Sequence, residues 1–466
     1  MQRIIAITWL TWKAALRFRL FLVIAVLLLA AVVGLPILIK DDGTARGFTQ
    51  ILLTYTLSTI TALLGLSTLW LSCGTLARDI EECQIQVVAT KPIARWQIWL
   101  GKWLGIVMLN AALLAISGAC VFGLLQWRAA KLPAAEQKVL REQVLVARGS
   151  ARPPDHAAEI DARTRQELLE KLKASPDLAK SADLPEVEKQ IRERIKAEYQ
   201  IALPGYWHPW QVDLSSQKDS LRDKPLQLRI KFNSASGAGG SRATYAGLWQ
   251  VGDGQKMEPW LSESMSLSAD TFHEFQVSSN LLDDKGMLTI GFLNLNPSTL
   301  LLFPVEDGVE VLYPEGGFAL NFARGLGIIF CWMALMAAIG LMAASFLSFP
   351  VAAFFSMAVL AVVLSSGTLA ETVASGSVGV GNEEKGIAGH SVTDVFLIPL
   401  FKGILNVVNL AKDFSPVDSL SSGRVISWGE LGAAFGQIVL LLGGVAGVIG
   451  IALFNRRELA TAQGNQ

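Results

Sequence analysis

Residues 20–39 read LFLVIAVLLLAAVVGLPILI, twenty consecutive residues without a charged side chain. A helix needs about 20 apolar residues to cross the hydrocarbon core of a bilayer. Comparable apolar runs occupy residues 50–73, 101–126, 318–346, 351–369 and 431–454. Two of them contain one charge each: Lys102 lies in the first turn of 101–126, and Arg324 lies near the start of 318–346. The sequence therefore predicts an integral membrane protein with about six transmembrane helices.

Charge is concentrated between the third and fourth of these runs. Residues 128–315 carry 23 of the 40 Lys and Arg residues and 27 of the 40 Asp and Glu residues, in a chain that is 52% hydrophobic. This segment is long enough to form a core of its own, and none of the four cysteines lies in it. Its small acidic excess argues against a nucleic-acid partner, which needs clustered positive charge.

Two kinds of apolar pattern divide the charged segment. Residues 163–173 and 186–199 place apolar side chains three or four positions apart, as on one face of a helix. Residues 227–232, 272–277 and 288–293 alternate or form short apolar runs between Gly- and Asn-rich turns, as strands do. Four tryptophans of the second part either line a binding face or, as we favour, serve as core and membrane-interface anchors: Trp207, Trp210, Trp249 and Trp260.

The predicted fold class is thus an α-helical membrane protein with an inserted extracytoplasmic α+β domain. The insert comprises a helical segment, residues 127–203, and an antiparallel β-sandwich, residues 204–316. Membrane blocks of three spans each flank it at residues 1–126 and 317–466, and the second block includes an extracytoplasmic surface helix at residues 394–412.

Basic residues near the span ends predict the orientation. They gather before the first run, between the second and third, and after the last: Arg3, Lys13, Arg17, Arg19, Arg78, Lys91, Arg95, Lys102, Arg456 and Arg457. The positive-inside rule places these segments in the cytoplasm. We therefore expect a multi-pass protein of the inner (plasma) membrane, with both termini cytoplasmic. Residues 1–19 are either an amphipathic helix on the membrane surface or simply the basic flank of the first span.

The sequence lacks the common catalytic and metal-binding motifs. It contains no Walker A pattern, no His-Glu-x-x-His and no Cys-x-x-Cys, and its four histidines are scattered. We therefore expect no catalytic residue, cofactor site or metal site in this chain. An ion site near the fifth run is a further alternative, less favoured than a solvated loop, at Glu371, Glu383, Glu384 and Asp394.

The most informative polar segment is residues 77–100, ARDIEECQIQVVATKPIARWQIWL. It reads as a short acidic helix followed by Pro92, which ends one helix and sets up the next. A short charged helix at the membrane surface suits the docking of a soluble partner, although an ordinary amphipathic loop has a similar composition.

This segment resembles the permease (transmembrane) subunit of ABC transporters of the ABC-2 exporter type. In that family a Glu-rich helix between spans two and three ends in Pro-Ile-(Ser/Ala)-Arg, followed by Gly-Lys. The matching residues here are Glu81, Glu82, Pro92, Ile93, Ala94, Arg95, Gly101 and Lys102. Residues 349–352 and 453–459 are also similar to the family, whereas Cys83 and Gln84 depart from its usual Gly-Thr. The resemblance covers the membrane blocks and not the insert.

The resemblance implies a transport subunit rather than an enzyme. Two permeases, either two copies of this chain or one copy and a homologous permease, would pair in the lipid bilayer. A separate ABC ATPase dimer, which carries ATP and Mg²⁺, would dock on the coupling helix within residues 77–100. The implied docking residues are Asp79, Glu81, Glu82, Gln84, Pro92 and Arg95.

The insert would then contact cargo or a periplasmic partner. The alternative function is a membrane-anchored extracytoplasmic binding or sensor protein without transport activity. An intramembrane enzyme is the least favoured, because the apolar runs lack paired ionisable residues.

Overall fold

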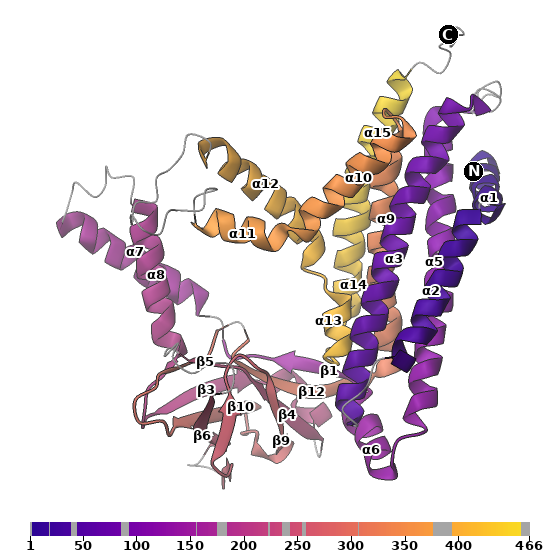
Figure 1. The fold of residues 1–466 in the computed structure, drawn as a ribbon. Coiled ribbons are helices and arrows are strands. Elements are labelled where there is room, and N and C mark those ends of the chain that lie inside the picture. Colours follow the sequence, from indigo (N-terminus) through magenta and orange to yellow (C-terminus); the bar gives the residue numbers. More distant parts are fainter. Residues whose placement is uncertain are drawn as a thin grey trace. The chain divides into compact units, whose positions relative to one another are not determined.

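The computed structural model describes residues 2–17, 19–38, 44–84, 93–154, 156–174, 184–221, 224–234, 243–253, 258–305, 307–375 and 394–457. The chain forms two compact units, which we call the helical unit (Met1–Val146 with Gly317–Gln466) and the insert unit (Ala147–Gly316). The first boundary lies at Val146 rather than at residue 126, because the helices that follow residue 126 pack within the helical unit. The chain is mostly helical, and its strands lie in antiparallel sheets (Figure 1).

Long helices dominate the helical unit. Its first half contains α1 (Gln2–Arg17), α2 (Arg19–Leu38), α3 (Ala45–Glu81), α5 (Arg95–Ala129) and α6 (Ala134–Val139). Its second half contains α9 (Phe318–Ala344), α10 (Phe349–Leu364), α11 (Ser366–Ser375), α12 (Asp394–Lys412), α13 (Pro416–Ser421), α14 (Trp428–Ala434) and α15 (Gly444–Arg456). A π-helical segment, Phe435–Gly443, joins α14 to α15.

Four helices are long and apolar enough to cross a membrane, which indicates a membrane protein. Among the described residues these are Gly47–Glu81, Arg95–Ala129, Phe318–Ala344 and Trp428–Arg456. Two further apolar stretches, Val23–Leu35 and Phe349–Leu364, are shorter. Four of the six predicted spans thus correspond to helices of sufficient length, and the number six stays a prediction.

The predicted fifth span, residues 351–369, is divided into two helices. α10 ends at Leu364, and α11 begins two residues later at Ser366. Ser365, Ser366 and Gly367 are all weak helix formers, which explains a break at this point. α11 packs on α12, where Lys412 Nζ donates to Ser366 Oγ at 2.7 Å.

The core of the helical unit lies between α3, α5 and α9, which run side by side (Figure 1). Leu57, Ile60 and Leu64 of α3 are fully buried, as is Ile328 of α9. A Cβ atom at Gly340 of α9 would overlap the Ser72 hydroxyl of α3. The two backbones therefore approach more closely than larger residues would permit, as is common between membrane helices.

α1 packs on the beginning of α5 through two glycines spaced four residues apart. Thr8 Oγ1 donates to the carbonyl of Gly101 at 3.1 Å. A Cβ atom at Gly105 would lie 2.7 Å from Cβ of Thr11. Residues 2–17 thus form a helix of their own, with one face against α5 and Trp9 on its exposed side. Its position relative to a membrane surface stays a prediction.

We expect Gly105→Leu to displace α1 from α5, because the new side chain would occupy the position of Thr11. Hydrogen exchange of the full-length protein in detergent should show loss of protection in residues 2–17. Gly123→Leu, in the same helix but with no atom within 4 Å of its Cβ position, is the matched control. Unchanged protection in Gly105→Leu would contradict this account of α1 packing.

The described residues of the insert unit form a helical hairpin and three antiparallel sheets. The hairpin is α7 (Ala157–Ala174) and α8 (Leu184–Gln200), which contain both predicted helical stretches. One sheet has the order β1-β12-β4-β9, from β1 (Val146–Ala151), β12 (Val309–Gly317), β4 (Pro225–Ile230) and β9 (His273–Ser278). A second has the order β3-β10-β6-β7, with β8 also paired to β6, from β3 (Trp207–Asp213), β10 (Met287–Asn294), β6 (Thr244–Val251), β7 (Trp260–Leu261) and β8 (Met265–Ser268). The third has the order β2-β11-β5, from β2 (Ile201–Ala202), β11 (Leu301–Leu302) and β5 (Asn233–Ser234).

The two larger sheets share one hydrophobic core. Leu228 of β4 and Ile290 of β10 both point into it and are fully buried. Trp249 is also fully buried, with its ring centroid 4.6 Å from that of Phe292. The favoured core role is therefore confirmed for Trp249, while Trp207 is 45% exposed. The predicted strands at residues 227–232, 272–277 and 288–293 correspond to β4, β9 and β10.

Candidate functional site

The predicted docking segment lies at one end of the helical unit, uppermost in Figure 1, where the ends of several helices meet. Asp79 of α3 and Lys102 of α5 form an ion pair of 2.5 Å. Lys102 Nζ also donates to the Thr75 carbonyl at 2.8 Å, and the lysine side chain is only 8% exposed. This ion pair therefore connects the end of α3 to the beginning of α5.

Arg95 fastens the beginning of α5 to the end of α15. Its Nη1 atom donates to the carbonyls of Phe454, Asn455 and Arg457 at 2.7, 2.9 and 2.9 Å. The last carbonyls of a helix lack partners within it and form the negative end of its dipole. The Arg95 guanidinium provides hydrogen-bond donors for these carbonyls. Because it stays charged, it also complements the negative end of the helix dipole.

Arg457 makes the same kind of contact with the end of another helix, α9. Its Nη1 atom donates to the carbonyls of Ala344 and Leu347 at 3.1 and 3.3 Å, at the end of α9. Burial lowers the pKa of the Arg457 guanidinium, and the negative charge of Glu81 raises it. Arg457 therefore takes part in helix packing, in addition to its value as an orientation signal.

Glu81 connects α3 to the beginning of α10. Its Oε1 atom accepts from the backbone N–H of Phe349 at 2.8 Å, at the first residue of that helix. An anion at a helix N-terminus satisfies an unpaired donor and complements the dipole. Beside it, the Arg78 guanidinium lies 4.5 Å from the centroid of the Phe349 ring.

The remaining predicted docking residues lie on the surface or outside the described residues. Glu82 and Gln84 are exposed, and Gln84 Nε2 donates to Glu82 Oε2 at 2.6 Å. Cys83 has a φ of 58°, the left-handed conformation in which glycine commonly ends a helix. Pro92 lies outside the described residues. The acidic stretch 79–81 belongs to the end of the 37-residue helix α3, so the expected short acidic helix does not begin there.

We call Asp79, Glu81, Arg95, Lys102 and Arg457 the helix-end junction. The structure brings together three of the six predicted docking residues and adds Lys102 and Arg457 to them. Sequence reasoning noted both added residues, one in a motif and one as an orientation signal. It could not identify their partners, because most of these contacts join segments more than 100 residues apart.

We expect Lys102→Met to lower the free energy of unfolding by about 2 kcal/mol, because it leaves the partly buried Asp79 carboxylate without its cation. The double variant Asp79→Leu/Lys102→Met should recover most of that loss, since neither charge then remains. Thermal unfolding in detergent of both single variants and the double variant measures the coupling. Additive losses would show that the pair contributes no coupling energy.

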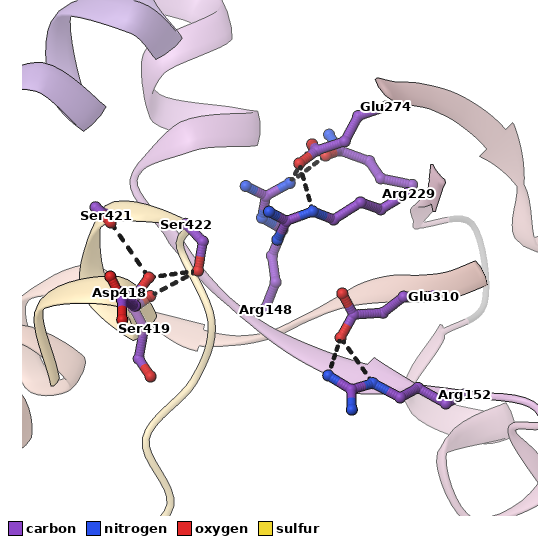
Figure 2. Close-up of polar contacts among 10 residues, drawn as sticks. Arg148, Arg152, Arg229, Glu274, Glu310, Asp418, Ser419, Ser421 and Ser422 are labelled. Carbon is purple, nitrogen blue, oxygen red and sulfur yellow. Dashed lines mark hydrogen bonds and ion pairs between the residues drawn. The ribbon is translucent and has the colours of Figure 1, made fainter. Parts of the chain in front are cut away.

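The insert unit carries a second polar cluster on its first sheet (Figure 2). Arg229 and Glu310 alternate along their strands with core residues such as Leu228 and Val311, so they lie on the opposite face of the sheet. Arg148 Nη1 lies 3.2 Å from Glu274 Oε2, and Arg229 Nε lies 3.8 Å from Glu274 Oε1. Arg152 Nη2 pairs with Glu310 Oε1 at 3.3 Å. Register explains the arrangement, because Arg229 stands opposite both Glu274 and Glu310 on the neighbouring strands. Through Glu274 the cluster links β1, β4 and β9, and Glu310 of β12 pairs with the residue that directly follows β1.

A cavity of about 180 Å³ opens between α2, α3 and α5 in the helical unit. A second cavity, of about 220 Å³, lies in the insert unit among aromatic and proline side chains that include Tyr199 and Trp210. His208 lies in its wall with its ring 4.5 Å from that of Trp210, and burial lowers the pKa of its imidazole. His208 therefore packs in the wall of this cavity. The described part of the chain contains no group of three His, Cys, Asp or Glu side chains that could hold a metal ion.

No protein-family model matches this chain, and neither a curated protein nor a solved structure matches it. The resemblance to ABC-2 permeases therefore stays a prediction from the sequence motifs alone.

Proposed function

We propose that this chain is the transmembrane permease subunit of an ATP-driven ABC transporter of the exporter type. Four helices long enough to span a membrane support a role within the bilayer. The observation that carries the proposal is the helix-end junction, because it consists largely of the residues on which the family resemblance rests. Glu81, Arg95 and Lys102 link the segment between α3 and α5 to the ends of other helices.

In this proposal the junction transmits force from a separate ATPase dimer. The exposed residues Glu82 and Gln84 are the sites for ATPase contact, because Glu81 and Arg95 are engaged within the helical unit. Movement of the docking segment reaches α10 through Glu81, and α15 through Arg95. Arg457 carries the same movement on to α9. ATP and Mg²⁺ belong to the ATPase subunit, and a second permease completes the pathway.

The proposal includes the finer topology predicted from the sequence. α2 and α10 complete a set of six spans, the junction faces the cytoplasm with both termini, and the insert unit lies outside the cell. The two larger sheets of the insert unit form the β-sandwich. The absence of charged pairs in the apolar runs suits a hydrophobic cargo or mechanical coupling to an envelope partner.

Purification from the native membrane through a C-terminal tag, followed by mass spectrometry, tests the proposal. A soluble ATPase should accompany the wild-type protein, and Glu82→Lys/Gln84→Lys should reduce its recovery at least tenfold. Both changes leave the junction contacts in place, unlike a change at Glu81. Glu170→Lys, a charge reversal at an exposed position of α7, is the matched control.

Recovery of no ATPase with folded wild-type protein would overturn the transporter proposal. It would favour the membrane-anchored binding protein, with the aromatic cavity of the insert unit as the place to search for a ligand. Equal ATPase recovery with the double variant would instead remove Glu82 and Gln84 from the docking surface.

A further inference from the structure

The cavity between α2, α3 and α5 has a largely apolar wall that includes four polar side chains: Ser67, Thr75, Arg78 and Asn110. Its apolar lining includes Ile24, Leu71, Leu109 and Leu113. Residues 67–78 of α3 contribute to the wall of the cavity, and Arg78 is the one nearest the helix-end junction. Ser67 lies at the other end, eleven residues away, which corresponds to about 16 Å along a helix. The cavity is therefore elongated, with a cation at one end and an apolar wall along most of its length.

Asn110 is the unusual side chain of this wall. It is only 2% exposed, yet its Nδ2 atom has no hydrogen-bond partner among the described residues. A buried amide donor without a partner costs roughly 1–3 kcal/mol relative to a paired one. Since Asn110 lines the cavity, a bound molecule with a hydrogen-bond acceptor at this depth would satisfy the donor.

The surroundings of the cavity indicate where such a molecule comes from. Trp70 lines the cavity and is 45% exposed, while Val23 and Leu27 of α2 are 59% and 49% exposed. These apolar side chains lie on helices that are apolar enough to contact lipid. A ligand that enters past them is amphiphilic and comes from the bilayer rather than from water.

We propose that this cavity binds one anionic glycerophospholipid. Its phosphate lies near Arg78, one ester carbonyl accepts from Asn110 Nδ2, and the upper part of an acyl chain runs along the wall toward Ser67. The order of these groups in the lipid, phosphate, ester and then chain, matches the order of Arg78, Asn110 and Ser67. Asn110 lies eight residues beyond Lys102 on α5, which is about 12 Å below the level of the junction.

Native mass spectrometry of the full-length protein in detergent tests the site, with phosphatidylglycerol and phosphatidylcholine supplied at equal concentration. The wild-type chain should retain one phosphatidylglycerol in preference to phosphatidylcholine. Ser67→Phe, which fills the cavity, should reduce retention at least tenfold, and Asn110→Leu should reduce it about five- to tenfold. Lys131→Gln, a basic residue beyond the other end of α5, is the matched control and should bind as wild type.

Thermal unfolding gives an independent reading in case Ser67→Phe folds poorly. Phosphatidylglycerol should raise the Tm of the wild type and of Lys131→Gln, but hardly that of Asn110→Leu. Without lipid, Asn110→Leu should be at least as stable as the wild type, because it removes an unsatisfied donor.

Undiminished phosphatidylglycerol retention in both Ser67→Phe and Asn110→Leu would overturn the proposed site. Equal retention of the two lipids by the wild type would overturn the headgroup role of Arg78. Neither outcome depends on whether an ATPase binds the chain.

Discussion

The arrangement of the helical unit depends on how the open ends of its helices are satisfied at one place. Arg95 donates to three carbonyls at the end of α15, and Arg457 donates to two at the end of α9. Glu81 accepts from the first N–H of α10. Helix ends carry unpaired backbone groups and partial charges, so a charged side chain from another helix both pairs and positions them. Apolar packing along the helices leaves their relative height weakly defined, whereas these contacts specify it.

This constraint gives the Gly-Lys motif at the beginning of α5 a structural meaning. Gly101 and Gly105 permit the close approach of α1, while Lys102 turns to the other side and pairs with Asp79. Adjacent residues thus hold two different neighbours of α5. A segment tied to so many helices is suited to convert a contact at its exposed tip into movement of the unit, which is the physical basis of the transporter proposal.

The insert unit is held together by a different interaction. Its two larger sheets bury alternate apolar residues in one core around Trp249, and the opposite face of one sheet carries paired arginines and glutamates. The described cysteines are all free, and none lies in this unit. Its stability therefore comes from apolar burial supplemented by paired charges, as is expected of a chain segment of this length.

Apolar run length and side-chain periodicity, both local properties, determined much of this description from the sequence. They predicted the long helices, the helical stretches within α7 and α8, the strands β4, β9 and β10, and the helix at residues 394–412. They did not predict the break between α10 and α11, because the length of an apolar run does not depend on the low helix propensity of Ser365, Ser366 and Gly367. Only the tertiary structure decided that Glu81 and Arg95 bind helix ends, whereas Glu82 accepts a hydrogen bond from Gln84. It also decided that Asn110 lines a cavity. The groups that a side chain contacts depend on which segments of the chain lie next to each other in the folded protein. Arg95 and Phe454, for example, are in contact although they are 359 positions apart in the chain.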